Sequence, residues 1–390
     1  MRSRGTIPHS DAPDPAYLSL MGMQGGYRGP GRAYTAYPNL RDVRWLFPAN
    51  APVMRRAGTR GLSSPGSLRG RILKQLMVVG AVRGEPARLE SEPLARLEGK
   101  MARILGETHV HLAFYVGVSG AYRKVMAQVL SAQGDTLAFA KIGIPPLARA
   151  AVEGEGRILL RLSESTALGG SVPEVLSRFG WQGGAVLLIT GGPTHPGPSD
   201  LSSVHARFCE RAFHSFAQEC AFGDSPMWIR MTDTLHRLTP YLPDPIPTHY
   251  DRAMRRLEQE LGTVRLPLSL AHRDFAPWNT RLGPAGLFVF DWERAQEGVI
   301  PLYDVFHFWA IQAALFGRRR RLPDRRFLQD LLGRQWPGGR EYMRWLYLAY
   351  LIDMSLDYSE ARIKAPDTGE QGVWRWFVEQ VRSFPEGSPL

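Results

Sequence analysis

The chain has 390 residues, 44% of them apolar, with ten Trp, thirteen Tyr and seventeen Phe. This composition is typical of a folded protein with a large core and excludes a disordered or collagen-like chain. The formal net charge is +11, but residues 1–84 hold thirteen Arg or Lys against three Asp and so carry +10 of it. Such a basic leader predicts a solvated arm or a weak contact with an anionic surface, and we expect no specific nucleic-acid partner.

No stretch of the sequence approaches the roughly 20 consecutive apolar residues that a membrane-spanning helix needs. Residues 1–10 contain arginines but are not followed by an apolar segment, so they do not resemble a secretory signal. We therefore predict a cytoplasmic protein that the basic leader can hold at the periphery of a membrane. The two cysteines, Cys209 and Cys220, are spaced to share one face of a helix. We expect both to be reduced apolar side chains.

The sequence pattern of the first 108 residues does not predict a compact lobe. Residues 1–66 are rich in Gly, Pro and Arg without periodicity, which predicts a basic, mostly irregular extension. Residues 67–108 predict a helical lead-in, because apolar residues recur every three or four positions at 68–82 and at 89–105. The side chains expected to anchor the extension locally are Tyr37, Trp45, Leu46 and Phe47.

Residues 109–194 have the pattern of a small β lobe. Three apolar runs separated by turn residues predict an antiparallel meander. A stretch with helical spacing follows at 147–162, and the apolar run 185–190 ends at a Gly-Gly-Pro break and predicts a buried strand. The three runs of the meander span residues 111–116, 125–130 and 137–142.

Residues 195–390 predict a mainly helical lobe. Apolar residues recur there at spacings of three and four over five separate stretches. Together with the preceding β lobe, this pattern predicts an α+β protein with two lobes. The five stretches are 199–221, 249–261, 303–316, 341–358 and 373–384.

One β interruption is expected in this helical lobe. Residues 279–282 and 287–290 flank a Gly-Pro-Ala-Gly turn and predict a hairpin. Asn279 and Asp291 stand at the two ends of that hairpin. The hairpin would therefore bring their oxygen-bearing side chains together beside Asp274.

These residues have the chemistry that phosphoryl transfer requires. The reaction needs a carboxylate that accepts the proton of the attacking hydroxyl, oxygen ligands for Mg²⁺, and positive groups on the nucleotide phosphates. Asp274 can supply the carboxylate, and Asn279 with Asp291 can supply two hard oxygen ligands. Glu293 is either a further metal contact or an exposed carboxylate.

The chain resembles the aminoglycoside phosphotransferase and choline kinase group, relatives of the protein kinases, in the segment HRDFAPWN and the following VFDWE. The resemblance extends over roughly residues 109–360. It implies a protein-kinase-like two-lobed fold whose first lobe binds the nucleotide. It also implies ATP or another nucleoside triphosphate as phosphoryl donor, Mg²⁺ as cofactor and a small molecule with a hydroxyl group as acceptor.

Carried over to this chain, the resemblance makes Asp274 the catalytic base and Asn279 and Asp291 the Mg²⁺ ligands. His272 would support the catalytic loop. Arg273 belongs to the same loop but departs from the small residue, usually Gly, that most members of the group have there. In this respect the chain is similar to the protein kinases.

A kinase-like first lobe must also contact the nucleotide phosphates. Gly117, Ser119 and Gly120 lie between the first two predicted strands, where glycine lets backbone amides approach a phosphate closely, although an ordinary hairpin turn fits them as well. Lys141 is central in an apolar strand, where a lysine is costly to place without a function. Lys124, beside the glycine turn, is the weaker alternative for the phosphate contact.

Lys141 needs an acidic partner on the helix that follows its strand. Glu155 shares the spacing of the apolar residues Ile158, Leu159 and Leu162, so it should face inward and pair with Lys141. Glu153 is the alternative partner.

The acceptor site is the part that the sequence describes least. Asp353 and Asp357 lie one turn apart on a predicted helix and could attract a cationic acceptor, or they could pair with arginines. Asp304, at a helix start, is expected to cap the helix or brace a loop. The aromatic residues that could face a cation, or simply fill the core, are Trp309, Trp345 and Tyr350.

The hypothesis that these patterns favour is an active kinase that phosphorylates a sugar, an amino alcohol or a related metabolite. The alternative is a nucleotide-binding scaffold with a kinase-like fold and little turnover. A scaffold has no physical need for the complete set of phosphate-binding, metal-binding and proton-accepting residues, so the set favours the enzyme. Its members are Lys141, Glu155, Asp274, Asn279 and Asp291.

Overall fold

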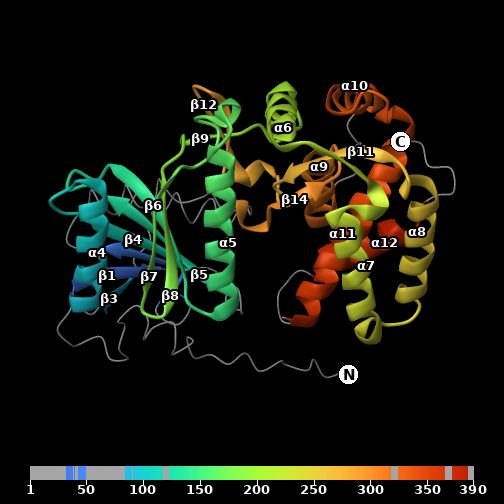
Figure 1. Ribbon diagram of the computed structural model, residues 1–390. Coiled ribbons are helices and arrows are strands. Elements are labelled where there is room, and N and C mark those ends of the chain that lie inside the picture. Colours follow the sequence, from blue (N-terminus) through green and yellow to red (C-terminus); the bar gives the residue numbers. More distant parts are fainter. Residues whose placement is uncertain are drawn as a thin grey trace, which may run out of the picture. The chain divides into compact units, whose positions relative to one another are not determined.

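The residues that the computed structural model describes form two compact units (Figure 1). We call them the β unit, which runs to Gly156 and includes 174–191, and the helical unit, which consists of 157–173 and the chain from Gly192 onward. The described residues are 32–37, 39, 43–49, 84–89, 91–116, 123–317, 324–364 and 371–384.

The β unit contains an eight-stranded sheet, coloured blue to green in Figure 1. All neighbouring strands are antiparallel, and their order is β3-β1-β2-β4-β5-β6-β8-β7. The strands are β1 (Arg32–Tyr37), β2 (Trp45–Pro48), β3 (Glu85–Leu89), β4 (His111–Val116), β5 (Lys124–Leu130), β6 (Thr136–Gly143), β7 (Val175–Trp181) and β8 (Gly184–Thr190).

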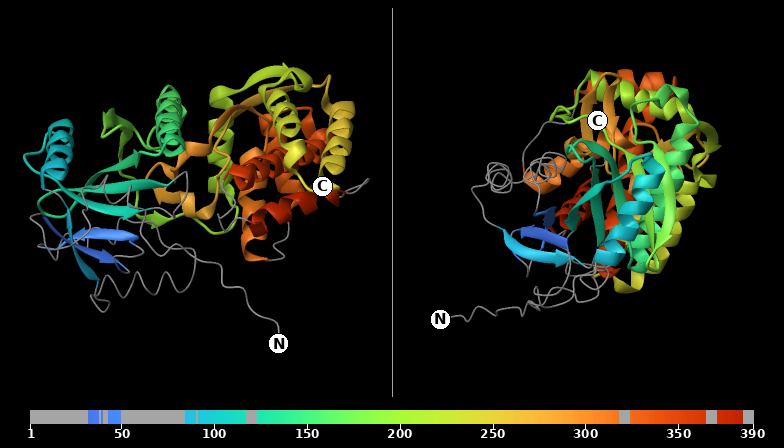
Figure 2. Two further views of the ribbon diagram at one scale, coloured as in Figure 1. Left: turned by 90° about the horizontal axis from the view of Figure 1, so that it is seen from below. Right: turned by 90° about the vertical axis from the view of Figure 1, so that its left-hand side faces the viewer.

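The predicted meander is confirmed as β4, β5 and β6, and the predicted strand at 185–190 is β8. Helix α4 (Ser91–Leu105) lies against the sheet (Figure 2, right), where Leu94, Leu97 and Met101 share one apolar core with residues of the strands. Helix α5 (Pro146–Ser163) begins in the β unit and ends in the helical unit. The helix predicted at 68–82 lies outside the described residues.

The expectation of mostly irregular structure for residues 1–66 is wrong for two stretches. Strands β1 and β2 lie within them, and β2 pairs with β4 in the interior of the sheet. Tyr37, Leu46 and Phe47 are almost completely buried. Backbone pairing with a distant strand supplies the order that the local composition does not suggest, so a truncation of residues 1–60 would remove part of the sheet. Most of the basic leader lies outside the described residues.

The helical unit consists of seven α-helices and two three-stranded sheets among its described residues. Helices α9 and α11 are apolar around most of their circumference and are mostly buried, whereas α8 and α12 are amphipathic and pack against α11. The helices are α6 (Ser203–Phe216), α7 (Pro226–Leu238), α8 (Ile246–Leu261), α9 (Tyr303–Phe316), α10 (Arg325–Gln335), α11 (Met343–Lys364) and α12 (Gln371–Arg382). One sheet has the order β10 (Gln218–Ala221), β11 (Arg265–Ala271), β14 (Gln296–Val299), and the other β13 (Gly286–Val289), β12 (Thr280–Gly283), β9 (His195–Pro196).

Two predictions about the helical unit need correction. The helix expected at 199–221 ends at Phe216, because the last four residues pair with β11 as strand β10. Cys220 therefore lies on a strand and does not share a helix face with Cys209, although both cysteines are free thiols as expected. The β interruption is also larger than predicted, since β11 and β14 join β10 in a second sheet.

The predicted α+β class is confirmed by a β unit built on an antiparallel sheet and a second unit that is mainly helical. The division differs in detail from the predicted boundaries at 108/109 and 194/195. Strands β1 to β3 and helix α4 extend the β unit toward the N-terminus, and residues 157–173 belong to the helical unit. Over the described ranges, no helix combines the length and the apolar character needed to cross a membrane.

Candidate active site

Lys141 and Glu155 form a buried ion pair within the β unit. Lys141 lies on β6 and Glu155 on α5, and their side chains are 2% and 1% exposed. The Lys141 Nζ donates to both carboxylate oxygens of Glu155, at 2.6 and 2.7 Å. A buried ammonium is costly unless it is paired and hydrogen-bonded, so this two-point contact fixes the position of the lysine.

The structure distinguishes between the alternatives that the sequence left open for this pair. Glu153 is 43% exposed and contacts Arg149 on its own helix, at 2.9 Å. Lys124 is at the start of β5, beside Gly143, and is only partly buried. Glu155 is therefore the partner of Lys141. The glycine turn with Gly117, Ser119 and Gly120 lies outside the described residues.

In the helical unit, β11 leads directly into the loop that begins at His272. Six of the seven residues of β11 are buried, so the loop starts from the interior of the unit. The fully buried His272 ring accepts a hydrogen bond at Nδ1 from the backbone amide of Asp274 at 3.2 Å, and Nε2 lies 3.0 Å from the carbonyl oxygen of Phe290. This arrangement requires the proton on Nε2. His272 thus ties the loop to the end of the β12–β13 hairpin.

Arg273 braces the same loop from the other side. Its backbone has a positive φ of 62°, a conformation uncommon for a residue with a side chain. Asp304 on α9 stabilises this turn by accepting hydrogen bonds from the amides of His272 and Arg273, at 2.8 and 2.9 Å. The expected bracing role of Asp304 is thus present, whereas Leu302, not Asp304, stands at the helix cap.

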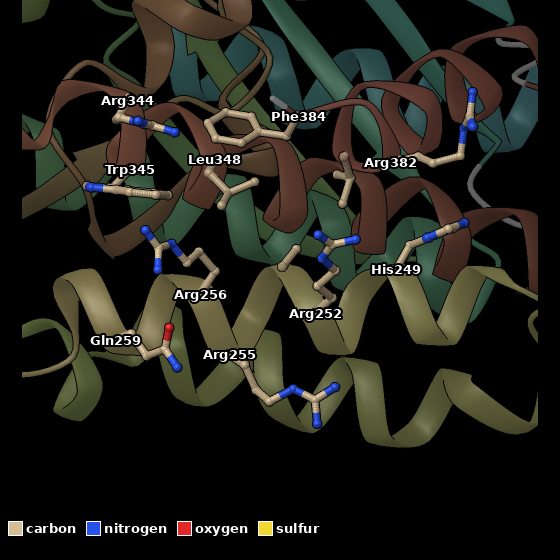
Figure 3. A pocket seen from close by; sticks show the side chains of 12 residues that line it. His249, Arg252, Arg255, Arg256, Gln259, Arg344, Trp345, Leu348, Arg382 and Phe384 are labelled. Atoms are coloured by element: carbon tan, nitrogen blue, oxygen red, sulfur yellow. The ribbon is translucent and has the colours of Figure 1, made fainter. Parts of the chain in front are cut away.

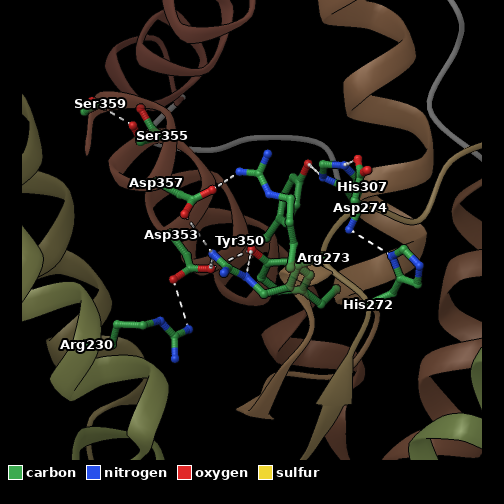
Figure 4. Close-up of polar contacts among 12 residues, drawn as sticks. Arg230, His272, Arg273, Asp274, His307, Tyr350, Asp353, Ser355, Asp357 and Ser359 are labelled. Atoms are coloured by element: carbon green, nitrogen blue, oxygen red, sulfur yellow. Dashed lines mark hydrogen bonds and ion pairs between the residues drawn. The ribbon is translucent and has the colours of Figure 1, made fainter. Parts of the chain in front are cut away.

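The Arg273 side chain reaches α11 (Figure 4). It donates to Asp353 Oδ2 at 2.8 Å and to the Tyr303 hydroxyl at 3.2 Å. Burial disfavours the charged guanidinium, but the carboxylate of Asp353 outweighs burial and raises the pKa of Arg273. Its contacts are therefore those of a residue that anchors the loop.

Asp274 is held by Asn279. The Asn279 Nδ2 donates to the backbone oxygen and to Oδ2 of Asp274, both at 2.9 Å. Burial raises the pKa of Asp274, but His307, Arg294 and His272 outweigh it, so the pKa is lowered overall. The side chain remains 25% exposed, so an ionised carboxylate with a fixed orientation is accessible at this position.

Sequence reasoning missed His307, which faces Asp274 from α9 (Figure 4). Its fully buried Nε2 lies 3.6 Å from Asp274 Oδ1, beyond normal hydrogen-bond distance, and it has no hydrogen-bond partner among the described residues. Nδ1 lies 3.2 Å from the Tyr350 hydroxyl. Burial lowers the pKa of His307, so its imidazole is neutral at pH 7. The sequence signal was a histidine within a mainly apolar helix.

The hairpin of β12 and β13 forms as predicted, with Thr280 opposite Val289. The amide of Phe290 donates to the carbonyl oxygen of Asn279 at 3.1 Å, which closes the open end of the hairpin. Asp291 follows with φ 71° and ψ 57°, a left-handed conformation that Asp tolerates better than most residues. Such local strain is often found at functional sites.

Asp291, Glu293 and Asn279 offer hard oxygen ligands. Oxygens of the Asp291 and Glu293 carboxylates lie within 4.8 Å of each other. The Asn279 amide nitrogen is committed to Asp274, which leaves the amide oxygen for a cation. Mg²⁺ prefers carboxylate and amide oxygens, so the residues present fit this ion.

Asp353 and Asp357 are paired with arginines, the alternative that the sequence left open. Asp353 contacts Arg230 at 3.1 Å in addition to Arg273 (Figure 4). Asp357 bonds to Arg294. Burial raises the pKa values of both aspartates, but these arginines outweigh burial and lower them. Three aromatic residues could face a cationic acceptor or fill the core. Tyr350 is fully buried, Trp345 is 7% exposed and lines a cavity (Figure 3), and Trp309 is partly buried.

Comparison with known proteins gives one family and several solved structures. A family model described as the phosphotransferase enzyme family matches residues 132–346, more than half of the chain. The chain is similar to a thermostable mutant of aminoglycoside phosphotransferase APH(4)-Ia, with 16% identity, 74% of this chain and 97% of that chain covered, and a TM-score of 0.49. It is also similar to amicoumacin kinase hAmiN in complex with AMP-PNP, Ca²⁺ and Ami, with 13% identity, coverages of 69% and 88%, and a TM-score of 0.44. No curated protein sequence matches the chain.

Proposed function

Because this chain belongs to the phosphotransferase enzyme family, we propose that it transfers the γ-phosphoryl group of ATP, or of another nucleoside triphosphate, to a hydroxyl group of a small molecule. The observation that carries this proposal is the Asp274 carboxylate, which is held by Asn279 and kept ionised by a lowered pKa. A carboxylate of this kind can receive the proton of an attacking hydroxyl.

The proposed reaction forms one bond and breaks another. The acceptor oxygen attacks the γ-phosphorus, the bond from that phosphorus to the bridging oxygen breaks, and the nucleoside diphosphate leaves with the electron pair. The hydroxyl proton passes to Asp274. Asn279 keeps the Asp274 carboxylate directed toward the acceptor, and His272 and Arg273 hold the loop through contacts with the hairpin and α11.

The donor side of the proposed site has two parts. Lys141, fixed by Glu155, would bind the α- and β-phosphates through its ammonium group. Asn279 and Asp291, with Glu293 as a further ligand, would hold Mg²⁺, which when bound neutralises charge on the transferred group and the leaving phosphates. For the acceptor, we propose a sugar, an amino alcohol or a related hydroxylated metabolite.

Product analysis distinguishes the enzyme from a nucleotide-binding scaffold. The full chain would be incubated with Mg²⁺, a nucleoside triphosphate and a panel of sugars, amino alcohols and metabolite extracts, and phosphorylated products would be identified by mass spectrometry. We expect a product that requires both Mg²⁺ and a particular acceptor. Nucleotide binding without a phosphorylated product from any acceptor would favour the scaffold.

Replacing His307 tests which contacts set the pKa of Asp274. The Asp274 carboxylate, 3.6 Å from Nε2, favours the tautomer that carries the proton on Nε2, and the proximity of His307 lowers the pKa of Asp274. Asp274 acts when ionised, so activity is lost as the pH falls through its pKa. In His307→Leu the lowering contribution is absent, and we expect the acid limb of the kcat/KM profile to move to higher pH.

His307→Gln is the matched control, because its amide can present a donor close to the position of Nε2. We expect it to return the acid limb toward that of the unmodified chain. A role of His307 in packing alone would change stability in both variants but leave the pH profile in place. An identical acid limb in His307→Leu would contradict the proposed tuning.

A further inference from the structure

Arg273 has a backbone conformation that favours glycine, yet it carries a long charged side chain. Its φ of 62° lies in the left-handed region, which a residue with a Cβ adopts only at a cost. Glycine would form the same turn without that cost, and the contacts of Asp304 with the turn involve only backbone amides. The arginine side chain therefore needs an explanation of its own.

The Arg273 side chain is held mainly by Asp353 on α11 (Figure 4). The two side chains are 5% and 4% exposed, and Arg273 Nη2 donates to Asp353 Oδ2 at 2.8 Å. The Tyr303 hydroxyl accepts a hydrogen bond from Arg273 Nε at 3.2 Å and donates to the same Asp353 oxygen at 2.5 Å. These three groups form a closed ring of hydrogen bonds. Because a buried guanidinium is costly without an opposite charge, Arg273 depends on Asp353.

Asp353 is in turn fixed by a second helix. Its other oxygen, Oδ1, accepts a hydrogen bond from Arg230 on α7 at 3.1 Å. Asp357, the next carboxylate along α11, lies farther from Arg273, at 4.0 Å, and bonds to Arg294. Asp353 is therefore the main partner of Arg273, and it connects α7 and α11 with the catalytic loop.

We propose, on the basis of the phosphotransferase function above, that Asp353 is a positioning residue, which keeps Asp274 correctly oriented through its ion pair with Arg273. One peptide bond joins Arg273 to Asp274, so a rotation of the turn at Arg273 moves the base directly. A misplacement of about 1 Å can cost roughly a hundredfold in rate. Asp353 thus supports the reaction without touching a substrate, and its two arginine contacts keep it from a cationic acceptor.

A double-mutant cycle separates this role from a contribution of Asp353 to the packing of α11. Asp353→Asn is made in the unmodified chain and in Arg273→Gly, in which the turn no longer needs an ion pair. We expect Asp353→Asn to lower kcat roughly ten- to a hundredfold in the unmodified chain, the size of a lost charge-assisted contact, and to change it little in Arg273→Gly. The affinity for nucleotide should stay the same, because the phosphate and metal ligands are unchanged.

Hydrogen exchange measures the same coupling without any turnover. The amides of His272 and Arg273 donate to Asp304, and mass spectrometry of peptides from the loop follows their exchange. We expect Asp353→Asn to speed this exchange roughly ten- to a hundredfold in the unmodified chain and little in Arg273→Gly. Coupled exchange in a chain that forms no phosphorylated product would contradict the phosphotransferase function but support the contact by which Asp353 holds the loop.

Glu360→Gln is the matched control. Glu360 is also on α11 and accepts a hydrogen bond from Arg237 on α7 at 2.8 Å, so its loss breaks an ion pair between the same two helices without reaching the loop. It should leave kcat and the exchange of the loop unchanged.

Two results would overturn the proposal. Equal effects of Asp353→Asn in the unmodified chain and in Arg273→Gly would show that Asp353 acts on the packing of α11 alone, and so would an equal loss in Glu360→Gln. Thermal unfolding of each variant checks the fold. An Asp353→Asn chain that folds only together with Arg273→Gly would show the same coupling through stability, whereas one that folds in neither background would contradict it.

Discussion

Replacing Asp274 by Asn is expected to lower turnover by about 10²- to 10⁴-fold, the usual contribution of a positioned acid or base. The substitution keeps the size of the side chain and an oxygen that can accept the hydrogen bond from Asn279. It removes the negative charge and with it the ability to receive a proton near pH 7. The measurement is the steady-state rate of product formation with the acceptor identified by product analysis.

The same variant should fold and bind nucleotide like the unmodified chain, because Lys141, Asn279 and Asp291 are unchanged. Asp330→Asn makes the same chemical change at a carboxylate that is 58% exposed on α10, and it serves as the control for charge. We expect full turnover from it. Near-normal turnover in Asp274→Asn would rule out the assignment of Asp274 as the base.

Replacing Asp291 should abolish the tight, Mg²⁺-dependent binding of nucleotide at ordinary metal concentrations. Metal coordination supplies several kcal/mol, so we expect the Mg²⁺ concentration needed for tight nucleotide binding to rise roughly a hundredfold or more. Titration of Mg²⁺ against a nonhydrolysable nucleotide, followed by fluorescence or calorimetry, measures this change directly. An unchanged titration would contradict the assignment of Asp291 as a ligand.

The backbone at Asp291 determines which substitution is informative. Its φ of 71° is unfavourable for Ala, so Asp291→Ala combines loss of the carboxylate with backbone strain. Asn tolerates this conformation about as well as Asp, so Asp291→Asn isolates the effect of the charge. Glu293→Gln gives the comparison: if Glu293 is a further ligand, its loss should also raise the Mg²⁺ requirement, but by less than the loss of Asp291.

Local sequence patterns were sufficient to predict several strands and helices of the molecule. Strands β4 to β6 and β8, and helices α5 and α9, were predicted within about one residue of their ends, because alternation and helical spacing are properties of a short stretch. The hairpin followed from a glycine turn between two apolar runs, and it brings the backbones on either side of Asn279 and Asp291 together. The pairing of Lys141 with Glu155 followed in the same way, from one strand and the next helix.

Other elements depend on partners far away in the chain, which the local pattern does not identify. Strands β1 and β2 are ordered by pairing with β3 and β4. Strand β10 ends a predicted helix because it pairs with β11 more than 40 residues later in the sequence. Conformational preferences are weak, and such long-range pairing overrides them.

The candidate site also depends partly on local sequence and partly on contacts between distant parts of the chain. The sequence by itself determined which residues have the right chemistry, Asp274, Asn279 and Asp291, since a carboxylate and an amide keep their functional groups in any fold. Only the tertiary structure decided that His307 faces Asp274 and that Arg273 bonds to Asp353, 80 residues away. Such contacts result from the packing of α9 and α11 near the end of β11. A buried charge is stable only when it is paired, and the tertiary packing decides which opposite charge lies close enough to pair with it.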